Sequence, residues 1–309
     1  IFLKKNYMSL VIIGTVAFDA IETPFGKTDK IVGGSATYVG YSATKLGVNP
    51  KLVAVVGDDF PEENISKLKS NGFDLEGLQV KKGEKTFFWS GKYHNDMNSR
   101  DTLITELNVL ENFDPIVPSS YQDCSYLMLG NLAPVLQQQV INSLNNRPKL
   151  IAMDTMNFWM DIAMDDLKKT VSMVDLLMIN DEEARQLSGE YSLLTAAEKI
   201  QAMGPKFLII KKGEHGALLF HGKEMFYAPA MPLPSVKDPT GAGDTFAGGF
   251  MGYITKTDDI SFANMKKAVV YGSALASFTV QEFGTDKIEA VTESDLDGRM
   301  AEFKALMSF

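Results

Sequence analysis

Short apolar runs that alternate with helical segments constrain the fold of this chain more than any other feature. The runs lack the apolar–polar alternation of a strand with one solvated face, which indicates strands buried on both faces, as in parallel sheets. Strands of this kind with helices between them predict an α/β fold with right-handed crossovers. The runs cover residues 10–13, 52–56, 126–129, 150–153, 176–179 and 207–210.

Helices are predicted between these runs and throughout the C-terminal third. Their length and the spacing of their apolar residues are typical of helices that cover a sheet. The segments are residues 36–46, 62–70, 134–145, 181–188 and 195–203, followed by 242–255, 261–281 and 293–307.

Two stretches break the alternation. Residues 15–35 are extended and rich in turns, and residues 79–107 hold three alternating segments with no helix between them. The second stretch indicates a small antiparallel sheet inserted into the α/β body. We therefore expect residues 1–309 to form one domain with lid segments at about 15–35 and 79–107.

Composition excludes several classes of protein and partner. The chain has 309 residues and a net charge of −9, which argues against binding a nucleic acid polymer. The single cysteine, Cys124, cannot form an intrachain disulfide, and the apolar run near the start is far shorter than a membrane span. We expect a cytoplasmic protein with no membrane partner. The first Met is Met8, so residues 1–7 are interpreted as a cloning remnant or an upstream start.

The strongest motif is Asp-Pro-Thr-Gly-Ala-Gly-Asp-Thr-Phe-Ala-Gly-Gly-Phe-Met at residues 238–251. Gly241, Ala242 and Gly243 allow a tight turn that presents successive N–H groups where a helix begins, which makes an anion hole. Asp244 holds a carboxylate beside it. This pair suits phosphoryl transfer to an alcohol, because the hole stabilises the phosphoryl charge and Asp244 accepts the hydroxyl proton. An isolated Gly-x-Gly-Asp would be better explained by a helix cap, and it is the full 14-residue string that favours phosphoryl transfer.

This string resembles the C-terminal signature of the PfkB family, the ribokinase-like sugar and nucleoside kinases. Other segments along nearly the whole chain resemble the family as well. The resemblance implies a three-layer α/β/α fold with a mostly parallel sheet and a small β-sheet lid, and it implies ATP and Mg²⁺ as cofactors. The similar segments are residues 14–19, 33–34, 45–47, 55–60, 180–183 and 211–216.

On the acceptor side, the resemblance implies that Asp19 binds substrate hydroxyls and that Gly33 and Gly34 close over the substrate. The family usually has an Asn four residues after the second glycine, and this chain has Tyr38 there. The choice of sugar is therefore open. The chain has only four arginines, of which only Arg100 lies in the inserted sheet, so a neutral acceptor is favoured over a phosphorylated one.

On the donor side, Asn180 and Glu183 resemble the Asn-x-x-Glu motif that organises magnesium and phosphate. Alone, this pair would indicate a capped surface helix. The nucleotide-binding strand and turn are implied at Lys211, Gly213, Glu214 and Gly216. Asp238 and Thr240 resemble positions that bind a monovalent cation in some relatives, which makes K⁺ a candidate cofactor.

The main hypothesis is an ATP-dependent kinase that phosphorylates a hydroxymethyl group of a small sugar. Tyr38 and the lid aromatics Phe87 and Trp89 leave an adenosine- or inosine-like nucleoside kinase as an alternative. A catalytically silent sugar-binding or scaffold relative is a second alternative, opposed by the intact Asp244, Asn180 and Glu183. A dinucleotide-binding oxidoreductase is disfavoured, because this chain lacks the Gly-x-Gly-x-x-Gly fingerprint after the first strand. The lid also makes a homodimer plausible, since family members use it as a dimer clasp.

Overall fold

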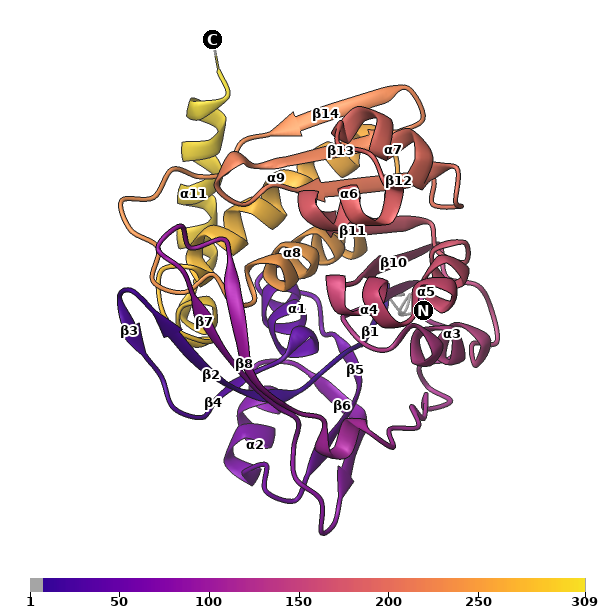
Figure 1. Ribbon diagram of the computed structural model, residues 1–309, viewed down its shortest axis with the longest axis vertical. Helices are drawn as coiled ribbons and strands as arrows, with labels where there is room; N and C mark the ends of the chain where they lie inside the picture. Colours follow the sequence, from indigo (N-terminus) through magenta and orange to yellow (C-terminus); the bar gives the residue numbers. More distant parts are fainter. Residues whose placement is uncertain (1–7, 309) are drawn as a thin grey trace, which may run out of the picture.

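The computed structural model describes residues 8–308, which contain one large and one small β-sheet with helices around the large one (Figure 1). The interpretation of residues 1–7 lies outside this range. The large sheet has the strand order β14-β13-β12-β11-β10-β9-β1-β5-β6. In that order the strands are Glu224–Ala228, Ala217–His221, Phe207–Lys211, Leu176–Asn180, Leu150–Asp154, Tyr126–Leu129, Leu10–Ile13, Lys51–Gly57 and Asp74–Lys81.

The helices form two layers, one on each face of the large sheet. Successive residues of a strand point to opposite faces, so Ile12 packs into one apolar core and Ile13 into the other. The layer on the Ile12 side contains α1 (Ser35–Thr44), α2 (Glu62–Ser70), α8 (Ala242–Thr257), α9 (Phe262–Thr279), α10 (Asp286–Ala290) and α11 (Glu293–Leu306).

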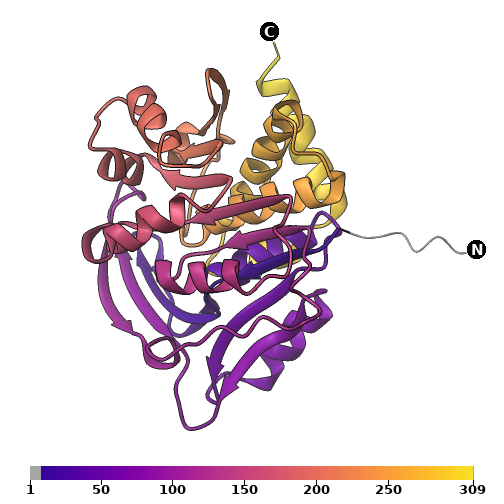
Figure 2. The same cartoon turned by 90° about the vertical axis from the view of Figure 1, so that its right-hand side faces the viewer.

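The layer on the Ile13 side contains α3 (Pro134–Asn142), α4 (Asn157–Ile162), α5 (Met164–Val171), α6 (Asp181–Ser188) and α7 (Leu193–Gln201). In Figure 2 the red helices of this layer and the yellow C-terminal helices lie on opposite sides of the strands. The three-layer α/β/α architecture expected from the sequence is therefore confirmed. Within residues 8–308, no helix combines the length and the apolar character that crossing a membrane requires.

The small sheet is built from two separate parts of the chain. It contains β2 (Ala17–Thr23), β3 (Gly26–Lys27), β4 (Ile31–Gly33), β7 (Phe88–Tyr93) and β8 (Arg100–Glu106). Strand β2 pairs with β7 in parallel, and the other pairs are antiparallel. The sheet is thus mixed, and the expectation of a purely antiparallel sheet is wrong, because β2 and β7 come from separate segments and need no hairpin.

The first segment of the 79–107 stretch belongs to the large sheet and not, as expected, to the small one. Residues 79–81 end β6, which pairs in parallel with β5 at the edge of the large sheet. An edge strand is half exposed and alternates in polarity as a lid strand does, so the pattern did not separate the two. The six apolar runs are all strands of the large sheet, whereas β13, β14, α4, α5 and α10 are not predicted by the sequence patterns.

The carboxyl ends of three neighbouring parallel strands supply polar residues to one edge of the large sheet. Strand β10 ends at Asp154, β11 at Asn180 and β12 at Lys211, and Asn180 is the direct cross-strand partner of Lys211. In open α/β sheets, ligands bind in the crevice outside these carboxyl ends. The candidate site therefore lies at this edge.

Candidate active site

The glycine-rich turn at residues 241–243 leads directly into α8. Gly241 is the N-cap residue and has a φ of 73°, a left-handed conformation that favours glycine. The N–H of Ala242 donates to the carbonyl of Pro239 at 3.2 Å, whereas the N–H groups of Gly241 and Gly243 have no acceptor among residues 8–308. Two N–H groups of the expected anion hole are thus free to bind an anion, and that of Ala242 shapes the turn instead.

Asp244 lies in the first turn of α8, where the sequence places it, and keeps part of its surface exposed. Burial raises the pKa of its carboxyl to about 7, with a further contribution from Asp154, while Lys211 and Arg100 act in the opposite direction. A carboxylate whose pKa lies near neutrality is matched to the work of a general base.

Asp19 and the two glycines of β4 and α1 meet on one side of Asp244. A side-chain carbon on Gly33 would lie 1.8 Å from the Asp19 carboxylate, so Gly33 leaves the space that this carboxylate fills. Gly34 has a φ of 95° and is the N-cap of α1. Burial, together with the nearby charges of Asp238 and Asp244, raises the pKa of Asp19 to about 7.

Tyr38 lies beneath the glycine-rich turn. A side-chain carbon on Gly241 would come within 2.5 Å of the Tyr38 ring. The side chain is 1% exposed, and its hydroxyl has no hydrogen-bond partner in the structure. Burial and the carboxylates of Asp19, Asp238 and Asp244 raise the pKa of this phenol well above its usual value, so the hydroxyl stays protonated and available as a donor.

The loop before the turn is braced from two directions. The carboxylate of Asp238 accepts hydrogen bonds from the N–H of Thr240 at 2.9 Å and from that of Gly284 at 3.1 Å. The Thr240 hydroxyl donates to the phenol oxygen of Tyr93, which ends β7 of the small sheet. The structure thus brings Asp238 and Thr240 next to the acceptor cluster of Asp19 and Tyr38.

Asn180 and Glu183 form a capping box at the start of α6. The N–H of Asn180 donates to Glu183 Oε2 at 2.7 Å, and the N–H of Glu183 donates to Asn180 Oδ1 at 2.8 Å. The capped-helix interpretation is therefore correct as geometry. Glu183 is nevertheless 6% exposed, and burial together with Asp154 raises its pKa to about 7, so the pair also faces the buried acids of the site.

The Lys211 ammonium donates to Asp154 Oδ2 at 2.7 Å. Burial alone would lower the pKa of Lys211, but Asp154 and Glu183 outweigh it and raise this pKa, which keeps the ammonium charged. The turn after Lys211 has two glycines in left-handed conformations, Gly213 with a φ of 53° and Gly216 with a φ of 83°. Glu214 is largely exposed on this turn and lies outside the buried cluster.

The sequence patterns alone assign no role to Asp154, Tyr93 or Arg100. Arg100 begins β8, and its charge lowers the pKa values of Asp244 and Glu183. Asn98, at the tip of the β7–β8 hairpin, would lie 2.8 Å from a side-chain carbon on Gly213, so the hairpin reaches the β12–β13 turn (Figure 1). Asp154 ends an apolar strand as Asn180 does, and this position at a strand end is the one sequence signal that points to it.

The residues around Asn180 suit Mg²⁺ held through water and phosphate better than a direct protein cage. Among residues 8–308 no group of three or more His, Cys, Asp or Glu side chains is arranged to hold a metal ion. Glu183 still offers a buried carboxylate whose Oε1 has no hydrogen bond to any described residue. Mg²⁺ retains several waters and binds one or two carboxylates plus substrate phosphates, which this arrangement permits.

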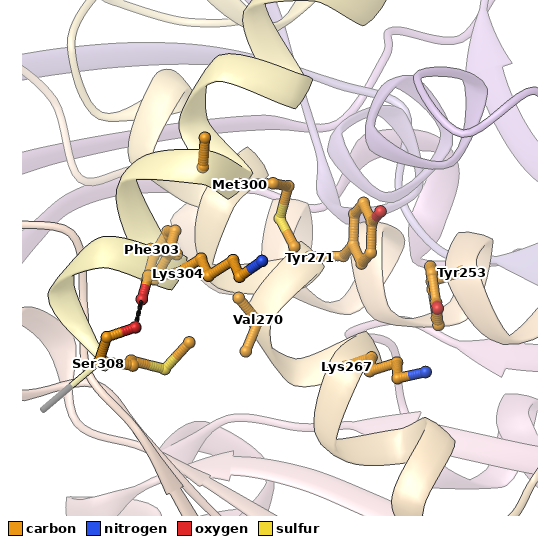
Figure 3. Close-up of a pocket in the computed structure, with 10 residues that line it drawn as sticks. Tyr253, Lys267, Val270, Tyr271, Met300, Phe303, Lys304 and Ser308 are labelled. Carbon is orange, nitrogen blue, oxygen red and sulfur yellow. Dashed lines mark hydrogen bonds between the residues drawn. The ribbon is translucent and has the colours of Figure 1, made fainter.

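A separate groove of about 580 Å³ lies between α8, α9 and α11 (Figure 3). Its walls are mostly apolar, formed by residues such as Tyr253, Tyr271, Met300 and Phe303. Tyr253 follows Asp244 by nine residues on the same helix, a separation of about 13 Å along the axis. The groove is therefore distinct from the acid cluster.

Comparison with known proteins agrees with this geometry. The profile of the pfkB family carbohydrate kinases matches residues 9–291. The cytidine kinase of Thermococcus kodakarensis is 32% identical over 250 residues, which cover 79% of this chain and 87% of that protein.

Solved structures agree on the fold. The nucleoside kinase of Methanocaldococcus jannaschii, an archaeal member of the ribokinase family, superposes with a TM-score of 0.77 at 20% identity and covers 96% of this chain and 99% of its own. An E. coli protein solved in complex with ATP and Mg²⁺ superposes with the same TM-score, identity and coverage. Fold, glycine-rich turn and sequence similarity together show that the chain is a kinase of the pfkB family, with the ribokinase fold.

Proposed function

We propose that this chain is an ATP- and Mg²⁺-dependent nucleoside kinase that phosphorylates the hydroxymethyl group of its acceptor. The observation that supports the nucleoside most is the 32% identity to a cytidine kinase across most of both chains. This reverses the order of the two sequence-based hypotheses, in which a small sugar came first. The scarcity of arginine still favours a neutral acceptor.

In the proposed reaction, Asp244 accepts the proton of the acceptor hydroxyl as its oxygen attacks the γ-phosphorus. The N–H groups of Gly241 and Gly243 donate to the transferring phosphoryl group, whose charge they stabilise together with the start of α8.

On the donor side, Asn180 and Glu183 would hold Mg²⁺ through water and phosphate oxygens, and the ion would supply charge neutralisation at the phosphates. Lys211, Gly213, Glu214 and Gly216 would bind the nucleotide. The two left-handed glycines let the backbone of the turn approach the ligand closely.

On the acceptor side, Asp19 would bind ring hydroxyls of the substrate, and Gly33 and Gly34 would allow the backbone to close on it. The unpartnered hydroxyl of Tyr38 would donate to a further acceptor hydroxyl, in place of the Asn that the family usually has there. The small sheet would cover the site as a lid and exclude water that would otherwise hydrolyse ATP.

The test is a coupled assay of ADP release across ribonucleosides, deoxyribonucleosides, neutral pentoses and hexoses, and sugar acids. We expect the highest kcat/KM with a ribonucleoside. Turnover with neutral sugars and none with nucleosides would favour the sugar kinase instead. ADP release that no acceptor raises above background would support the catalytically silent relative.

Potassium is proposed as an additional cofactor near Asp238 and Thr240. Asp238 is 1% exposed, and its carboxylate accepts from two backbone N–H groups but forms no ion pair with any residue in the range 8–308, which supports a bound cation nearby. Turnover measured in potassium-free and sodium-free buffer, and again after addition of potassium chloride, tests this. Equal rates in both would contradict it.

A homodimer through the small sheet is also proposed. Strand β8 is exposed along its whole length, and Leu103 and Ile104 are 55% and 47% exposed. An exposed apolar edge strand is a ready template for pairing with a second copy. Light scattering on the wild type and on Ile104→Asp tests it: we expect twice the chain mass for the wild type and a shift to the monomer for the variant.

A further inference from the structure

The buried ion pair between Asp154 and Lys211 connects two strands that are not neighbours. Asp154 ends β10 and Lys211 ends β12, and β11 lies between them. Two strand spacings amount to about 10 Å, which the long lysine side chain crosses to place its ammonium 2.7 Å from Asp154 Oδ2. The two side chains are only 16% and 7% exposed.

Stability alone does not account for this pair. Moving two charges out of water costs several kcal/mol per ion, and an apolar pair of similar volume is often as stable. Ala152 and Ile209, two positions earlier on these strands, share a face with the pair and are apolar and buried, so an apolar pair would fit the surroundings. A role at the site is therefore the more direct explanation.

The pair places a positive charge at the glycine-rich turn. A side-chain carbon on Gly243 would lie 3.0 Å from the Lys211 nitrogen. Gly243 does not have a positive φ, so its backbone conformation does not require glycine. The absence of a side chain at 243 leaves room for the ammonium beside the free N–H groups of the anion hole.

The Lys211 ammonium also has N–H donors that bind no other described residue. A lysine has three N–H donors, and Asp154 is the only acceptor that Lys211 contacts among residues 8–308. Asp154 fixes the direction of the side chain and leaves the remaining donors for a ligand. An anion seated on Gly241 and Gly243 would lie within reach of them.

We propose that Lys211 is a catalytic residue that donates to the transferring phosphoryl group, and that Asp154 is the positioning residue that aims it. The acceptor oxygen forms its bond to the γ-phosphorus, the bond from that phosphorus to the β,γ-bridging oxygen breaks, and ADP leaves with the electron pair. The hydroxyl proton goes to Asp244. Lys211 keeps its proton and stabilises charge on the phosphoryl oxygens throughout. The inference rests on the proposed function only in using Asp244 and the anion hole as the place of transfer.

The first experiment needs no acceptor. ADP with aluminium fluoride and Mg²⁺ mimics the transferring phosphoryl group, and its binding is compared with that of ADP alone by calorimetry. We expect Lys211→Met to weaken binding of the mimic about 100-fold and Asp154→Asn about 10-fold, the range for loss of one charged donor and for its misplacement. ADP alone should change less than threefold. Equal losses for both ligands would overturn the proposal and leave Lys211 as a nucleotide-binding residue.

A second experiment separates a structural from a catalytic role. Asp154→Leu removes the carboxylate that accepts from the buried Lys211 ammonium and should lower the melting temperature, whereas the double variant Asp154→Leu, Lys211→Met removes both members of the pair and should restore it. We expect kcat to stay at least 100-fold low in the double variant. Recovery of kcat together with stability would show that the pair is only structural.

Asp175→Asn provides a matched control. Asp175 pairs with Arg147 at 3.0 Å and accepts from the N–H of Ile151, at the opposite ends of the same strands. The Asp175→Asn variant should keep both its affinity for the mimic and its kcat within about twofold of the wild type. Because mimic binding is independent of the acceptor, the Lys211 result stands or falls separately from the choice between nucleoside and sugar.

Discussion

The two sides of Asp244 differ in how they balance charge. On the donor side, Asp154 and Glu183 surround a buried ammonium, that of Lys211. On the acceptor side, Asp19 and Asp238 face each other and the phenols of Tyr38 and Tyr93, and the causes of the raised pKa of Asp19 include no cation. Lys211 therefore balances the negative charge of the donor side before the substrates bind. The carboxylates of the acceptor side have no such cation, and their charge has to be balanced by a ligand or removed by protonation.

The largest effect is expected at the residue that both sides share. Asp244→Asn should lower kcat by about 100-fold or more, because the amide cannot accept the hydroxyl proton. Steady-state kinetics with the preferred acceptor measures it, and circular dichroism checks that the variant is folded. A kcat within threefold of the wild type would remove Asp244 from its assigned role.

Alanine variants of Gly33 and Gly243 should show that the acceptor and donor sides differ in how well they accommodate an added side-chain carbon. In Gly33→Ala the new carbon meets the short, buried carboxylate of Asp19, so we expect the acceptor KM to rise about 30-fold and the fold to lose about 1–3 kcal/mol of stability. In Gly243→Ala the carbon meets only the flexible end of Lys211, so stability should change by less than about 1 kcal/mol while kcat falls. Kinetics and thermal unfolding of both variants provide the readout, and equal destabilisation would contradict the contrast.

The uncompensated acceptor side should also appear in the pH dependence of stability. The pKa of Asp19 is raised to about 7, so between pH 4 and 7 the folded state binds more protons than the unfolded state. The contribution of Asp19 to the stability of the ligand-free protein is therefore present at low pH and is lost as the pH rises towards 7. Asp19→Asn should therefore gain on the order of 2 kcal/mol at pH 8 and much less at pH 5. Denaturant unfolding at both pH values measures this, and a gain independent of pH would argue against it.

The smallest effect is expected from removal of the Tyr38 hydroxyl. Tyr38→Phe removes one neutral hydrogen bond, which corresponds to a 3- to 10-fold increase in the acceptor KM with little change in kcat. An acceptor lacking the ring hydroxyl that Tyr38 contacts should be insensitive to the substitution. Tyr41→Phe, on the same helix but outside the acid cluster, is the control. An equal loss with every deoxy acceptor would mean that Tyr38 contacts no acceptor hydroxyl.

The sequence predicted most of the large sheet because those strands are buried on both faces and read as unbroken apolar runs. It failed at strands with an exposed face, where β6 at the sheet edge and the lid strands share one pattern. The glycine-rich turn was predictable because three adjacent residues define it. Asp154 was not identified, because its importance comes from a lysine 57 positions away that reaches it across β11.

The position of Tyr38 has a consequence for redesigning this enzyme. Its hydroxyl faces the acceptor cluster while its ring supports Gly241 of the anion hole. A smaller residue introduced at 38 to admit a different acceptor would also remove the support beneath the turn that we propose to bind the transferring group. Substrate range and turnover are therefore coupled at this position.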